Sequence, residues 1–118
     1  MTKDFKERLY IFVLQVIKLI RKLPHELVNE VISKQLMRSS TSILANYIEA
    51  KSASSKKDYI NFFTHALKSA NESKVWLALL RDTCQNNQEN IRYLLKELGE
   101  ISNIIAASII TLKKNVKE

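Results

Sequence analysis

The sequence predicts an all-α protein, an up-down-up-down antiparallel four-helix bundle. Among 118 residues Gly and Pro each occur once, so the tight turns that β-sheet folds require are almost unavailable. Apolar residues also recur at alternating steps of three and four in four segments, as in helices that pack lengthwise against others. A chain of this length and ordinary apolar content forms one globular domain, here residues 1–118.

The first two helices are expected over residues 3–23 and 25–52. Pro24 separates them, because proline disfavours helical geometry in the residue before it and fits the first turn of a new helix. The first helix has a regular apolar stripe, formed by Phe5, Leu9, Phe12, Val16, Leu19 and Leu23. The second is apolar at Leu27, Val28, Val31, Ile32, Leu36, Ile43, Leu44 and Ile48.

The last two helices are expected over residues 56–84 and 88–116. Ser54 or Ser55 can cap the third helix, with Asp58 in its first turn. Gly99 lies inside the fourth helix and marks either a tight helix contact or an imperfection that costs about 1 kcal/mol relative to Ala. The apolar stripes are Tyr59, Phe62, Ala66, Ser69, Ser73, Trp76 and Leu80 in the third helix and Ile91, Leu94, Leu98, Ile101, Ile105, Ser108 and Leu112 in the fourth.

Basic residues are concentrated at one end of the expected bundle. The net charge is +7, which suits a nucleic acid or another anionic partner. Phosphate contacts need only clustered positive charge, so we expect RNA or DNA to bind this end without sequence-specific readout. Lysines at helix C-termini have the alternative role of complementing the helix dipole. The candidate nucleic-acid-binding residues are Lys3, Lys6, Arg8, Lys51, Lys56, Lys57, Lys113, Lys114 and Lys117.

The first and fourth helices carry more apolar residues than one bundle needs to bury. A second apolar stripe runs beside the main stripe of the first helix, and an extended exposed apolar patch usually marks an interface. We therefore expect a homo-oligomer, the alternative being a large core with some apolar surface. The candidate interface residues are Tyr10, Val13, Leu14, Ile17 and Ile104.

Catalytic and metal chemistry have little support in this sequence. One glycine cannot form a phosphate-binding loop or a nucleophile elbow, and neither His25 nor His65 follows a Glu at dimetal spacing. We expect no catalytic residues, no metal and no cofactor. Cys84 is the single cysteine, so no intramolecular disulfide forms and a reducing compartment is expected. The apolar run 9–17 is too short to span a membrane, and acidic residues before it argue against a signal peptide.

A polar stripe runs along one side of the second helix, and the third helix also carries polar residues. Gln35, Ser39, Ser42, Asn46 and Glu49 share one side of the second helix, and the third offers Ser69, Glu72 and Ser73. Hydrogen bonds between the helices would fix their register. The alternative is a site for a small molecule.

The stretch 35–50, Gln-Leu-Met-Arg-Ser-Ser-Thr-Ser-Ile-Leu-Ala-Asn-Tyr-Ile-Glu-Ala, resembles the signature helix of a bacterial family. These four-helix-bundle proteins were first noticed in intervening sequences of large-subunit ribosomal RNA genes and are also called the S23 ribosomal protein family. The likeness continues through Asp58-Tyr59, residues 66–72 and residues 76–80. The signature residues, carried over by position, are Gln35, Arg38, Ser39, Ser42, Asn46, Glu49, Glu72 and Trp76.

The resemblance implies a non-enzymatic bacterial cytoplasmic protein that forms a homopentameric ring. The family is also similar to the accessory protein of diversity-generating retroelements, which is a basic pentamer that engages a reverse transcriptase and nucleic acid. The leading hypothesis is a basic, oligomeric bundle that binds nucleic acid at its charged end. The alternatives are an assembly or adaptor module whose main partner is a protein, such as a reverse transcriptase, and a small-molecule binder that uses the polar stripe.

Overall fold

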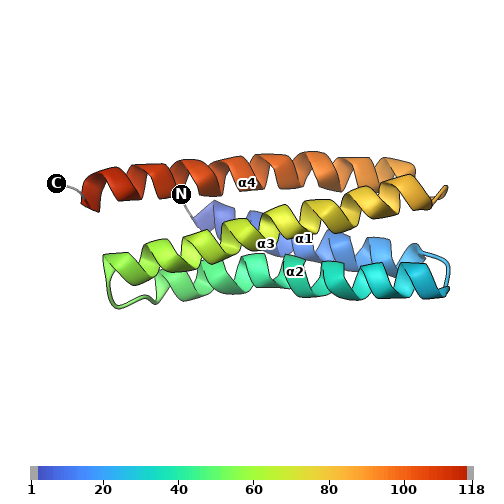
Figure 1. Cartoon of the computed structure of the whole chain (residues 1–118), viewed down its shortest axis with the longest axis horizontal. Coiled ribbons are helices and arrows are strands. Elements are labelled where there is room, and N and C mark those ends of the chain that lie inside the picture. Colours follow the sequence, from blue (N-terminus) through green and yellow to red (C-terminus); the bar gives the residue numbers. More distant parts are fainter. Residues whose placement is uncertain (1–2, 117–118) are drawn as a thin grey trace.

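The computed structural model describes residues 3–116, and this range folds into four long antiparallel helices. Successive helices join through short turns and form an elongated body of 51 × 21 × 21 Å (Figure 1). Within the described range, each helix approaches the next in sequence, α4 returns to α1, and diagonal pairs do not meet. The predicted up-down-up-down bundle is therefore confirmed. The elements are α1 (Lys3–Lys22), α2 (Leu27–Lys51), α3 (Lys56–Thr83) and α4 (Gln88–Val116).

The predicted core stripe is correct in α1 and only partly correct in α3, where Ala66, Ser73 and Leu80 are buried as predicted. Every member of the α1 stripe is buried, from Phe5 to Leu23. In α3 the buried side chains include Phe63, Ala70 and Leu77, whereas the neighbouring residues Phe62, Ser69 and Trp76 are half-buried. Heptad spacing describes both rows equally well, so only packing against α2 and α4 decides which row is central.

The ends of α2 and α3 show which local residues stop and start the helices. Glu26, not Pro24, caps α2: its carboxylate accepts a hydrogen bond from the Asn29 backbone N–H at 3.1 Å. The prediction that Pro24 lies in the first turn is wrong, because α2 begins at Leu27 and Pro24 precedes the cap. The Pro24 carbonyl accepts a hydrogen bond from the Asn29 side-chain amide at 3.0 Å. Ser55 caps α3 as predicted, accepting from the Asp58 N–H at 3.1 Å.

Two further findings bear on the sequence predictions. A Cβ placed on Gly99 would meet nothing within 4 Å, so this glycine does not serve a tight helix contact. Over the described residues, none of the helices combines the length and apolarity needed to cross a bilayer.

Candidate nucleic-acid interface

The antiparallel fold brings the candidate lysines to one end of the bundle. The end of α2, the start of α3 and the end of α4 meet there, and α1 begins slightly further in (Figure 1). Asp4, Glu7, Glu49 and Asp58 share this end, but lysines outnumber them. We define the lysine-rich pole by its described and exposed lysine side chains, which are Lys6, Lys51, Lys56, Lys57, Lys113 and Lys114.

Two of the candidate lysines lie beyond what the structure describes. The side chain of Lys3 and the whole of Lys117 fall outside the described residues. Lys113 and Lys114 lie in the last turn of α4, where their charge also complements the helix dipole. Lys56 and Lys57 lie in the first turn of α3, where the dipole opposes them, so their position is not explained by helix stability.

Arg8, predicted to bind nucleic acid, is half-buried and already pairs with carboxylates of another helix. Its guanidinium donates to both carboxylate oxygens of Glu97 at 2.7 Å and to Glu100 at 2.9 Å, joining α1 to α4. The hydrogen bond to Glu97, followed by that to Glu100, raises the pKa of Arg8, although burial opposes the rise. Because two carboxylates surround this cation, Arg8 contributes little positive potential to the pole.

Lys51 is held by an aromatic cluster at the pole. Its ammonium donates to the Tyr59 hydroxyl at 2.9 Å, and this hydrogen bond raises the pKa of Lys51. The ammonium also lies 5.3 Å from the centre of the Tyr47 ring, close enough for a cation–π contact. Phe63 stacks on Tyr59 with ring centres 4.9 Å apart. The predicted site thus lacked an aromatic residue, Tyr59, which the heptad pattern had assigned to the core.

The signature residues form a hydrogen-bonded polar seam between α2 and α3. Ser39 and Ser73 are buried and their hydroxyls are 2.7 Å apart, while the Ser69 hydroxyl donates to Ser42 at 2.9 Å. The other polar residues of the seam also form hydrogen bonds within it. Arg38 donates to Gln35 and to Glu72. Trp76 also donates to Glu72, and Asn46 donates to Ser42.

The seam therefore satisfies its own polar groups across the two helices. No buried side-chain nitrogen or oxygen atom among the described residues lacks a partner. Glu49 is exposed on the same side of α2, one turn beyond Asn46. Such a network is expected to fix the register of α2 against α3, because slippage by one residue would leave buried hydroxyls unpaired.

The predicted oligomer interface is only partly available at the surface. Tyr10 and Leu14 are 55% and 41% exposed, while Ile17 and Ile104 are half-buried. Val13 is only 8% exposed, because it packs inside the bundle, and so it is not part of a free surface.

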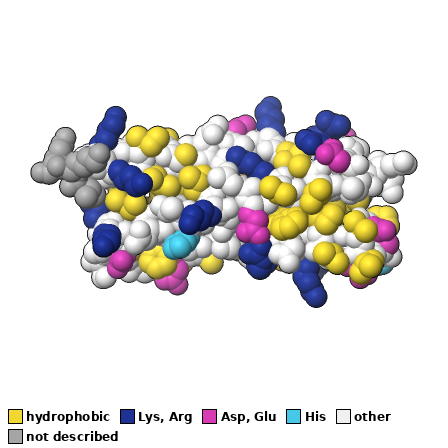
Figure 2. All heavy atoms as spheres, in the orientation of Figure 1, with side chains coloured by type: hydrophobic (Ala, Val, Ile, Leu, Met, Phe, Trp, Pro, Cys, Tyr) yellow, Lys and Arg dark blue, Asp and Glu magenta, His cyan; other side chains and the backbone are white. Residues whose placement is uncertain are grey.

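A second apolar surface lies where the sequence analysis did not place one. The seam's register sets the start of α2 beside the second half of α3, and both present apolar side chains there. Figure 2 shows them gathered over the half of this face that is far from the lysine-rich pole. This α2–α3 apolar patch consists of Leu27, Val28, Val31, Val75 and Leu79, all exposed.

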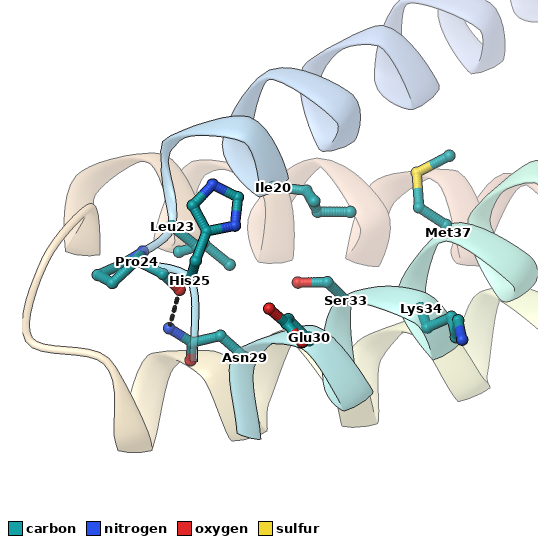
Figure 3. Close-up of a pocket in the computed structure, with 9 residues that line it drawn as sticks. All are labelled: Ile20, Leu23, Pro24, His25, Asn29, Glu30, Ser33, Lys34 and Met37. Carbon is teal, nitrogen blue, oxygen red and sulfur yellow. Dashed lines mark hydrogen bonds between the residues drawn. The ribbon is translucent and has the colours of Figure 1, made fainter. Parts of the chain in front are cut away.

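A hollow of about 320 Å³ lies at the turn between α1 and α2, opposite the lysine-rich pole. Figure 3 shows Ile20, Leu23 and Met37 on its apolar side, with Ser33 and His25 above α2. The hydrogen bonds of Asn29 at this hollow stabilise the turn. Its side-chain amide donates to the Pro24 carbonyl and accepts a hydrogen bond from the Cys84 thiol. Within the described residues, no three His, Cys, Asp or Glu side chains are grouped as a metal site.

These features define a class: a basic all-α bundle whose central helices are joined by a polar seam. Residues 4–107 match the family of the 23S rRNA-intervening sequence protein, and the chain belongs to this family. It is also similar to a crystal structure from Bacteroides thetaiotaomicron VPI-5482, described as a protein with unknown function from the S23 ribosomal protein family. The two share 37% identity over 89% of this chain and 97% of the other, with a TM-score of 0.79. No functionally curated protein matches the chain.

Proposed function

We propose that this protein is a non-enzymatic, cytoplasmic, self-assembling bundle that binds RNA or DNA non-specifically through its lysine-rich pole. The observation that carries the proposal is the meeting of exposed lysines from three helix ends. Among the described residues, Lys6, Lys56, Lys57, Lys113 and Lys114 have no carboxylate within ion-pair distance. Unpaired ammonium groups are the contacts that phosphates require.

Self-assembly would strengthen this binding. The family resemblance implies a homopentameric ring, and in a ring each copy presents its own lysine-rich pole, so their potentials add. Two exposed apolar surfaces on one chain support such an arrangement, because a ring contact joins two different faces of neighbouring copies. One of these surfaces is on α1, around Tyr10 and Leu14, and the other is the α2–α3 apolar patch.

A salt titration tests the nucleic-acid proposal. Binding of a labelled RNA should weaken about 10³-fold between roughly 50 and 200 mM salt if the described lysines contact phosphates. The triple variant K56Q/K57Q/K113Q should bind weakly and show a shallower salt dependence. The matched control K18Q/K22Q/K34Q removes the same charge from exposed lysines elsewhere and should bind like the original protein. Absence of binding at low salt, or equal effects of the two triples, would contradict the proposal.

The second candidate is an assembly module whose main partner is protein, and the α2–α3 apolar patch favours it. If this patch is a contact between copies, V31E/V75E should lower the mass measured by light scattering. Y10E/I17E tests the α1 surface in the same way. Unchanged masses for both variants would exclude self-assembly through these surfaces. The polar seam does not favour the small-molecule alternative, because its groups bond to one another.

A further inference from the structure

Two adjoining hollows lie at the lysine-rich pole, and both are lined by Tyr59 and Leu112. The first, of about 390 Å³, is also bordered by Lys56 and the α2–α3 turn, including Ser54 and Ser55. The second, of about 350 Å³, lies between α3 and α4. Its lining also includes Lys51, Phe63, Ser108 and Thr111. Each volume falls in the range of small-ligand sites, about 300–1,000 Å³.

The Tyr59 ring is held in a fixed position between these hollows. Phe63 stacks against one of its faces, with ring centres 4.9 Å apart and planes 27° from parallel. Lys51 is 2.9 Å from the hydroxyl and 5.4 Å from the ring centre, so the ammonium lies beyond the hydroxyl edge rather than over a face. The remaining exposed part of this half-buried ring borders both hollows.

An anchored aromatic ring between ammonium groups suits one kind of nucleic acid. In single strands, base faces are free to stack on an aromatic side chain while neighbouring phosphates meet lysines. In a duplex the base faces are stacked on each other, so a ring that lines a hollow cannot stack on them. Lys56 borders the first hollow and Lys51 the second, and Tyr59 lines both, so each hollow joins the ring to a lysine.

We propose that the lysine-rich pole prefers single-stranded nucleic acid, with an unpaired base entering the hollow beside Tyr59 and flanking phosphates on Lys51 and Lys56. This inference rests on the proposed function and deepens it. Tyr59 supplies the stacking surface, and the lysines supply attraction that does not depend on sequence. The preference follows from base accessibility, so any pyrimidine or purine strand without stable pairing is a ligand.

The chain contains a matched control for this tyrosine. Tyr93 on α4 is 56% exposed and borders a smaller hollow of about 230 Å³, together with Lys18 and Lys22. It also lies beside lysines, but at the end of the bundle opposite the lysine-rich pole. If any exposed tyrosine near lysines increased affinity, Tyr93 and Tyr59 would have similar effects.

The experiment compares an oligothymidylate of about 12 nucleotides with a duplex of the same length, by fluorescence anisotropy at about 50 mM salt. The original protein should bind the single strand at least tenfold more tightly. Y59L should weaken single-strand binding about tenfold and leave duplex binding nearly unchanged, because it removes the stacking ring while the lysine charges remain. Y59F keeps the ring and should retain most of the affinity, and Y93L should bind like the original protein.

Several results would overturn the inference. Equal affinity for both nucleic acids, with the salt dependence intact, would refute single-strand preference and leave the proposed function standing. Equal losses for Y59L and Y93L would refute the role of Tyr59. Absence of any binding would overturn both proposals. If Y59L loses its helical circular dichroism signal, photocrosslinking of a 5-iodouracil strand decides instead: crosslinks on Tyr59 support the inference and crosslinks only elsewhere refute it.

Discussion

Replacing Gly99 by Ala should stabilise the protein. Gly99 lies in the interior of α4, eleven residues after the helix begins at Gln88, and its backbone φ is not positive. An added Cβ would meet nothing within 4 Å. The substitution therefore restricts the unfolded chain without creating a clash in the folded one.

The magnitude follows from helix propensity. Ala is favoured over Gly in a helix interior by about 1 kcal/mol, so the free energy of unfolding should rise by that amount. With an unfolding entropy of about 2.1 cal/mol/K per residue, this increment raises the Tm of a 118-residue domain by about 4 °C. The opposite change, Ala45→Gly at an exposed position inside α2, should lower Tm by a similar amount and serves as the control.

Thermal and urea unfolding followed by circular dichroism measure both variants. Protein concentration must be the same throughout, because the apparent stability of an oligomer depends on it. The urea midpoint of Gly99→Ala should rise with the slope m unchanged. A lower midpoint at unchanged m would refute the reasoning, since it would show that something occupies the space beside Gly99, such as a neighbouring copy in an assembly.

Three further predictions concern side chains that join the helices. Ser39→Ala should lower the free energy of unfolding by about 1 kcal/mol in urea titrations. A double-mutant cycle with Ser73→Ala should show that the two losses are not additive, and full additivity would exclude a direct interaction. Arg8→Gln should cost about 1 kcal/mol in thermal unfolding, less at high salt, with RNA affinity nearly unchanged; a large loss of affinity would show that this cation contacts phosphate. The raised pKa of Lys51 means that its hydrogen bond to Tyr59 stabilises the fold below the ordinary value of 10.5 and is lost as pH rises through the higher folded value. The stability difference between the original protein and Lys51→Met should thus shrink only above about pH 10.5, and shrinkage near neutral pH would contradict this assignment.

The helices and their order could be predicted, but some of their ends and faces could not. The stripe from Phe5 to Leu23 repeats regularly, and all of its members are buried as predicted. In α3, the predicted and the buried rows share Ala66, Ser73 and Leu80 and have the same spacing, and the small residue Ala70 gave no hydrophobic signal in favour of the buried row. Pro24 was expected in the first turn of α2, but the helix begins only at Leu27, after the cap Glu26, because the exact start depends on backbone geometry that a residue pattern does not contain.

The candidate site was also predicted only in part, because a residue pattern does not show contacts between distant segments. Antiparallel topology alone placed lysines of three helix ends together, and the structure agrees for those that it describes. Sequence reasoning could not see that Arg8 meets two carboxylates of α4, because its partners are about ninety residues away. Tyr59 was missed because an aromatic residue at heptad spacing is typical of a core position.

By itself, the sequence determined the all-α class, the four helices, their antiparallel order and the end at which positive charge collects. These properties depend on local propensity and residue spacing, which are present in the sequence of each segment. Only the tertiary structure decided which residues are buried in α3, which cations are already paired, and that Tyr59 borders two hollows between Lys51 and Lys56. Those properties arise from contacts between segments distant in sequence, so they exist only once the helices have packed.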